Sequence, residues 1–123
     1  MELNEITEKV IGCAIKVHRA LGPGLLESTY EVCLAHELVK EGLKVKTQVA
    51  LPVVYDGLRL DAGYRIDMLV EDAVIVELKS IESLHLIHEA QVISYLKLSG
   101  KKIGLLINFN VKLLKGGIKR LIN

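Results

Sequence analysis

Residues 67–79 read Asp-Met-Leu-Val-Glu-Asp-Ala-Val-Ile-Val-Glu-Leu-Lys, and this stretch decides the fold. Two apolar segments flank a short polar turn at residues 71–73, which is the pattern of a β-hairpin. The second segment, residues 74–79, is apolar on both faces, as is typical of a central strand that is covered on both sides. We therefore expect a sheet whose central strand ends in Glu77, Leu78 and Lys79.

The length of the turn at residues 71–73 decides which side chains face each other. A three-residue turn pairs Val70 with Val74 and places Asp67 opposite Glu77, on the same face of the sheet. A two-residue turn would instead move Glu77 to the other face. Lys79 shares a face with Glu77 because alternate residues of a strand point the same way. With a three-residue turn, the hairpin carries an acidic pair beside a lysine.

Two carboxylates so close together repel each other and favour taking up a proton or a cation. Mg²⁺ and Mn²⁺ prefer oxygen ligands, and Asp67, Glu77 and the backbone carbonyl of Leu78 could supply three of them. Lys79 could then orient an attacking water or balance charge in a transition state. The alternative is an ordinary Glu–Lys pair on a surface hairpin. The apolar neighbours disfavour it, because charged groups are costly in a covered sheet.

The rest of the chain predicts helices around these strands. Asn4 is a suitable N-cap for the first helix, and Asp56-Gly57 is a strong hairpin turn. We expect helices at residues 4–21, 25–42, 84–99 and 111–122, and extended segments at residues 45–55, 58–70, 74–79 and 103–108. Three strands in a meander, a crossover helix and another strand predict a mixed α/β sheet with helices on both faces.

Two of these helices carry polar residues that need an explanation. Glu27 lies in the first turn of the second helix, where the helix dipole alone favours a carboxylate. Gln91 and Tyr95 lie one turn apart in the third helix, and His88 shares their stripe, which should otherwise be apolar. Polar groups on a sheet-facing stripe need partners. Either they form a satisfied core network, or they contact a substrate or a metal-bound water.

The chain has 123 residues, of which half are apolar and a quarter are charged, so we expect a single compact domain at residues 1–123. The apolar runs are too short to cross a membrane, and no secretory signal is visible, so we expect a cytoplasmic location. The net charge is only +1. Basic residues nevertheless cluster near the C-terminus, a pattern that favours a solvated helix face over a phosphate-binding patch: Lys112, Lys115, Lys119 and Arg120.

Residues 24–30, Gly-Leu-Leu-Glu-Ser-Thr-Tyr, read as GxxExxY. Together with residues 17–31, 63–80, 88–97 and 104–111, they make the chain resemble the GxxExxY protein family over nearly its whole length. That family is placed in the PD-(D/E)XK nuclease superfamily. The resemblance implies an αβββαβ core and a single nuclease-like domain at residues 1–123.

The resemblance also implies which residues form the site. It assigns Glu27 to the helical acidic position, Asp67 to the first strand acid, Glu77 and Lys79 to the ExK element, and Gln91 with Tyr95 to the QxxxY element. The proline that precedes the first acid in the superfamily is Ile66 here. Glu27 enters the site only through this resemblance.

The implied function is Mg²⁺- or Mn²⁺-dependent hydrolysis of phosphodiester bonds in DNA or RNA. The alternative is a non-catalytic domain that keeps the nuclease fold to bind nucleic acid or protein. No separate target-recognition domain is visible, so a homodimer could enlarge the binding surface. The complete set of acids and lysine favours the enzyme.

Overall fold

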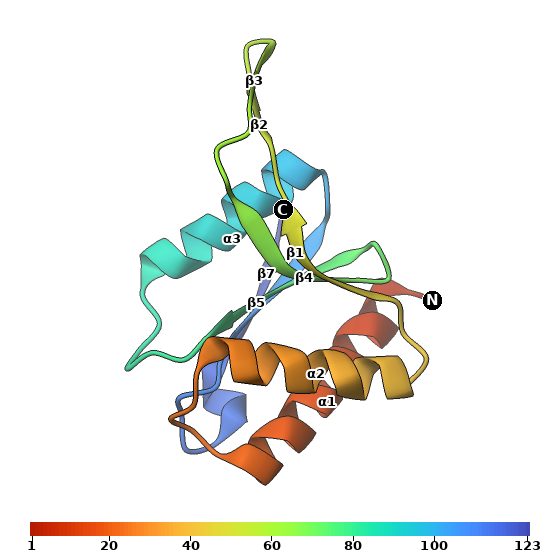
Figure 1. The fold of residues 1–123 in the computed structure, drawn as a ribbon, viewed down its shortest axis with the longest axis vertical. Coiled ribbons are helices and arrows are strands. Elements are labelled where there is room, and N and C mark those ends of the chain that lie inside the picture. The colour runs from red at the N-terminus through yellow and green to blue at the C-terminus, as the bar shows by residue number, and fades with distance from the viewer.

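A computed structural model describes residues 1–123 as helices packed around a five-stranded sheet, with a separate two-stranded ribbon (Figure 1). The helices are α1 (Leu3–Leu21), α2 (Glu27–Lys40), α3 (Leu86–Ser99) and the short 3-10 helix η1 (Leu114–Gly117). The strands are β1 (Val45–Ala50), β2 (Val53–Tyr55), β3 (Leu58–Leu60), β4 (Arg65–Val70), β5 (Val74–Lys79), β6 (Ile103–Asn108) and β7 (Ile118–Ile122). No helix combines the length and the hydrophobicity that a membrane span requires.

The five-stranded sheet is mixed, in the order β1-β4-β5-β6-β7. β1, β4 and β5 are antiparallel neighbours, α3 crosses over so that β6 runs parallel to β5, and β7 returns antiparallel to β6. α1 and α2 cover one face, and α3 covers the other (Figure 1). This arrangement confirms the predicted mixed α/β fold with helices on both faces.

β5 is the central strand, and every residue from Val74 to Leu78 is buried. Val74, Val76 and Leu78 pack in the core beneath α1 and α2, whereas Ile75 packs in the core beneath α3. Because side chains alternate along a strand, Glu77 points to the α3 face. It is the one charged residue in this covered segment, as the sequence predicted.

The C-terminal segment differs from the sequence prediction. Residues 111–122 do not form an amphipathic helix. After a loop and η1, residues Ile118–Ile122 form β7 and pair with β6 along Ile103–Ile107. Two neighbouring glycines, Gly116 and Gly117, weaken a helix, and the fully buried strand β6 gains a hydrogen-bonded neighbour on its outer side. The basic residues of this segment therefore lie on a loop, a 3-10 turn and a strand.

Two further expectations are corrected. The predicted long hairpin at residues 45–70 is divided, because the pairing breaks around Pro52 and again at residues 61–64. β2 and β3 form a protruding ribbon around the expected Asp56-Gly57 turn (Figure 1). Asn4 does not cap α1, because the helix begins one residue earlier at Leu3; its side chain instead accepts a hydrogen bond from Arg120.

Candidate functional site

The hairpin between β4 and β5 has the register that the acidic pair requires. Val70 pairs with Val74, and the pairing runs back to Met68 and Val76. One step further, the same register places Asp67 opposite Glu77. At this position the hydrogen bond between the strands is made by a side chain: the Oδ2 atom of Asp67 accepts the amide hydrogen of Leu78 at 2.9 Å. The three-residue turn is thus confirmed, and both acids lie at the same end of the sheet.

Glu77 is an unusual carboxyl group because it is buried. It is 5% exposed, and its Oε1 has no hydrogen-bond partner. Burial raises the pKa of Glu77 to about 10, and the adjacent Asp67 carboxyl adds to the rise, whereas the charge of Lys79 opposes it. In the absence of a cation, Glu77 therefore holds a proton at neutral pH. A buried carboxyl oxygen without a partner is what a bound cation would satisfy.

The backbone of Leu78 adds a third oxygen to this end of the sheet. The carbonyl of Lys79 accepts a hydrogen bond from Phe109, which follows β6, so it points toward β6. Successive carbonyls of a strand point to opposite sides, so the Leu78 carbonyl points toward β4. The amide hydrogen of Leu78 points to the same side and is donated to Asp67.

The donor set therefore consists of hard oxygens: the two carboxylates and the carbonyl of Leu78. These donors suit Mg²⁺ or Mn²⁺, which coordinate oxygen and commonly keep several waters. No three His, Cys, Asp or Glu side chains converge closely enough to hold a metal by themselves. The residues present fit a site in which water or substrate completes the coordination.

Glu27 comes to the same region from the other layer. It begins α2, and its Oε2 accepts a hydrogen bond from the amide of Ser80 at 3.3 Å. The Ser80 hydroxyl in turn donates to the carbonyl of Leu25 at 2.6 Å. The start of α2 is thereby hydrogen-bonded to Ser80, the residue that directly follows Lys79. Lys79 is itself half-buried.

The other two residues of the GxxExxY motif build the loop that positions Glu27. Gly24 has φ of 94°, in the left-handed region that favours glycine. The buried hydroxyl of Tyr30 donates to the carbonyl of Gly22 at 2.6 Å and accepts the amide hydrogen of Leu25 at 3.1 Å. Its ring stacks on Phe109, with centroids 4.4 Å apart. The motif thus anchors a turn and presents an acid at its end.

α3 brings an aromatic residue close to the acids. Tyr95 is 8% exposed, and its pKa is raised by burial first, then by the charges of Glu77 and Asp67 and by Tyr64, whereas the Gln91 side chain lowers it. Gln91 itself is exposed. The expectation that these polar side chains face the sheet is therefore confirmed for Tyr95 and wrong for Gln91. His88 is also placed differently: its Nδ1 accepts the amide hydrogen of His85 and stabilises the start of α3.

Sequence reasoning missed Gln48, which contacts the acidic pair. Its side-chain amide donates to Glu31 Oε1 at 2.8 Å and to Asp67 Oδ1 at 3.4 Å. The ladder between β1 and β4 omits this position, and Gln48 has φ of 51°, a conformation that non-glycine residues rarely adopt. A glutamine in an edge strand carries no signal that would have predicted this backbone.

Asn108 was also missed. It lies beside Lys79 in the β5–β6 register and is 2% exposed. Its side chain accepts the amide hydrogens of Ile81 (3.1 Å) and Asn110 (3.2 Å) and donates to the carbonyl of Ile81 (3.0 Å). It therefore fixes the loop that leaves Lys79. The available signal was a polar residue at the end of an entirely apolar strand.

Comparison with known proteins agrees with this fold. The family model of the PD-(D/E)XK nuclease superfamily matches residues 4–121. No curated protein and no solved structure matches the chain. The matched segment includes both helical layers and the five-stranded sheet except for the first residue of α1 and the last residue of β7, and it contains Asp67, Glu77 and Lys79. The chain therefore belongs to the PD-(D/E)XK nuclease superfamily.

Proposed function

We propose that this protein hydrolyses phosphodiester bonds in DNA or RNA with the help of Mg²⁺ or Mn²⁺, and that it belongs to the GxxExxY group within its superfamily. Nucleases of this superfamily typically use divalent metals. One observation carries the proposal: the buried Glu77, with an unpartnered oxygen, lies opposite Asp67 at the end of a central strand, next to Lys79. A purely structural carboxyl would be costly at this position.

In this proposal Asp67, Glu77 and the Leu78 carbonyl hold the cation, and Glu27 contributes directly or through a water. A bound divalent cation would polarise the phosphoryl oxygen and make a bound water more acidic. Asp67 is already oriented by the amide of Leu78, and Glu27 by the amide of Ser80. Little rearrangement of these two carboxylates is then needed when substrate arrives.

Lys79 and Gln91 act on the water and the phosphate rather than on the cation. The Lys79 charge lies near enough to Glu77 to oppose the rise in its pKa. In this proposal the ammonium group orients the attacking water and stabilises negative charge on the phosphate in the transition state. Gln91 is exposed and lies beside Tyr95, where its amide can contact substrate or water.

A non-catalytic binding domain is the second candidate, and one observation favours it. No three side chains of the metal-binding types converge, so the cation would rely on Leu78 and on water for the rest of its coordination. A domain that had lost cleavage could retain the same fold and bind nucleic acid without cutting it. Activity separates the two functions.

The test is a cleavage assay on a panel of single-stranded and duplex DNA and RNA, with and without Mg²⁺ or Mn²⁺. We expect metal-dependent cleavage by the wild type and a loss of about 10²–10³-fold or more in Lys79→Ala, the effect of removing a group that stabilises transition-state charge. Lys97→Ala, which removes an exposed lysine from α3, is the matched control and should cut normally. Equal cleavage by wild type and Lys79→Ala would refute the proposed role. No metal-dependent cleavage of any substrate would favour the binding domain.

A further inference from the structure

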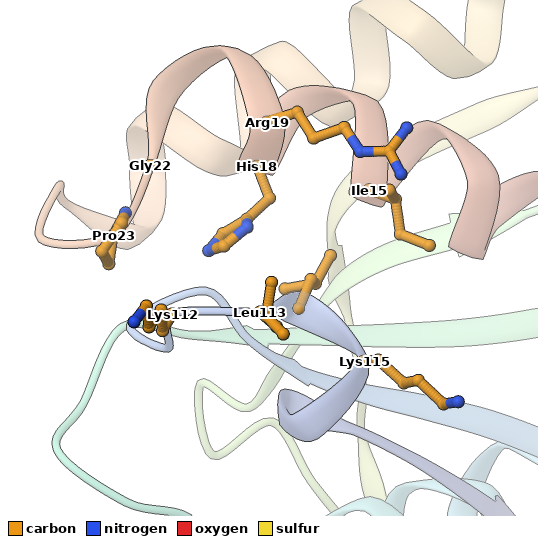
Figure 2. Close-up of a pocket in the computed structure, with 9 residues that line it drawn as sticks. Ile15, His18, Arg19, Gly22, Pro23, Lys112, Leu113 and Lys115 are labelled. Carbon is orange, nitrogen blue, oxygen red and sulfur yellow. The ribbon is translucent and has the colours of Figure 1, made fainter.

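A cleft of about 500 Å³ lies between the C-terminal end of α1 and the segment that leads into η1 (Figure 2). It contains none of the candidate site residues. Ile15, Leu113 and Leu114 give it apolar surface. The buried His18 holds its two walls together, because Nε2 lies 2.8 Å from the carbonyl of Val111. A carbonyl can only accept, so Nε2 carries the proton and donates.

The charged residues that line this cleft are all cations: Arg19, Lys112 and Lys115. All three are exposed, and none takes part in the four ion pairs of the structure. Figure 2 shows Lys112 beside Pro23 at one end of the cleft, with the Arg19 and Lys115 side chains extended toward the other end. Because the three charges do not meet at one point, they suit an extended polyanion better than a single phosphate ion.

The loops that line the cleft are connected by hydrogen bonds to the strand end that carries the candidate site. Gly22 and Pro23 line the cleft, and the same loop continues to Leu25, whose carbonyl accepts from Ser80. On the other wall, Asn110 precedes the cleft residues and donates through its side chain to the carbonyl of Ile81 at 3.2 Å. The two loops that form the cleft are thus hydrogen-bonded to the two residues that follow Lys79.

We infer that this cleft binds the phosphate backbone of a nucleic-acid strand, away from the phosphate that is cut. The inference rests on the proposed function, since it takes the substrate to be a nucleic acid. With a net charge of only +1, the chain as a whole attracts polyanions weakly. A local group of unpaired cations beside the catalytic end of the sheet supplies the attraction that the rest of the surface lacks.

The test compares two triple variants that remove the same charge. The cleft variant is Arg19→Gln/Lys112→Gln/Lys115→Gln. The control is Lys46→Gln/Lys97→Gln/Lys102→Gln, which removes exposed lysines near the opposite end of the sheet, where β1 and β6 begin and α3 ends. Binding of labelled single-stranded and duplex oligonucleotides is measured by fluorescence anisotropy over a range of salt concentrations. A chelator is present, so that binding is read without cleavage.

We expect the cleft variant to bind at least about tenfold more weakly near 0.1 M salt. Loss of three phosphate contacts should lower the slope of log affinity against log salt by about 2 for single strands and about 3 for duplex. The control should keep its slope. The conservative variant Arg19→Lys/Lys112→Arg/Lys115→Arg should restore binding. Circular dichroism of each variant checks the fold.

Several results would overturn the inference: no binding by the wild type, unchanged binding by the cleft variant, or equal loss in both triples. Selective loss of binding to phosphatidylserine vesicles, with oligonucleotide binding unchanged, would assign the cleft to a membrane surface instead. Failure of the proposed function looks different. In that case cleft-dependent binding persists, but no Lys79-dependent cleavage is found.

Discussion

Replacing Glu77 with glutamine should stabilise the metal-free protein at neutral and alkaline pH. Glutamine has nearly the same shape as glutamic acid but cannot ionise. In the wild type, burial and the Asp67 carboxyl raise the pKa of Glu77 from 4.5 to about 10. The folded state therefore keeps a proton that the unfolded chain releases. The resulting stabilisation is fully present below pH 4.5 and is lost as the pH rises toward 10.

The size of the effect follows from proton linkage. A difference of one bound proton between the folded and unfolded states changes the free energy of unfolding by about 1.4 kcal/mol per pH unit. Between pH 5.5 and pH 7.5 the wild type should therefore lose roughly 3 kcal/mol relative to Glu77→Gln. That is a large part of the roughly 5–15 kcal/mol that stabilises an ordinary domain.

Urea unfolding at a series of pH values in chelator measures this difference. The plot of unfolding free energy against pH should fall more steeply for the wild type than for Glu77→Gln, by about 1.4 kcal/mol per unit. Glu82→Gln removes an exposed carboxylate from the following loop and should leave the wild-type slope unchanged. Parallel curves for the wild type and Glu77→Gln would refute the buried, protonated state of Glu77.

Two further substitutions test how the site is supported. Gly117→Ala places a Cβ against the carbonyl of Asn108 and should cost about 1–3 kcal/mol of unfolding free energy, whereas Gly116→Ala meets no neighbouring atom and should cost far less in the same urea assay. Tyr30→Phe leaves the carbonyl of Gly22 and the amide of Leu25 without their hydrogen-bond partner, so it should cost about 1–3 kcal/mol of unfolding free energy. Thermal unfolding measures this loss, and an unchanged melting temperature would contradict it.

The arrangement of the central hairpin could be predicted because local and global requirements agree there. The three-residue turn at residues 71–73 pairs Val70 with Val74, and this register brings Asp67 opposite Glu77. The crossover through α3 to a parallel β6 followed from the order of the elements. The acidic pair could therefore be predicted from the sequence on the condition that the turn has three residues, which the structure confirms.

The remaining features depend on contacts between residues that are distant in sequence. The apolar residues of the C-terminal segment have helical spacing: Val111, Leu114, Ile118 and Leu121. Residues 118–122 nevertheless form a strand, because they pair with the outer side of β6. Local periodicity cannot detect such pairing. Gln48 is likewise set by Glu31 and Asp67, and Asn108 by the loop at Ile81. The contact of Glu27 with Ser80 spans 53 residues, and only the family resemblance assigned Glu27 to the site.

A calorimetric titration of the protein with Mn²⁺ at neutral pH tests the central claim most directly. We predict a saturable heat of binding in the wild type. This heat should depend on the ionisation enthalpy of the buffer, because Glu77 releases its proton when the cation binds. Asp67→Asn keeps an oxygen for the amide of Leu78 but removes the charge, so it should abolish this heat, whereas Glu82→Gln should retain it. No saturable binding in the wild type, or equal binding by Asp67→Asn, would contradict a metal site formed by Asp67 and Glu77.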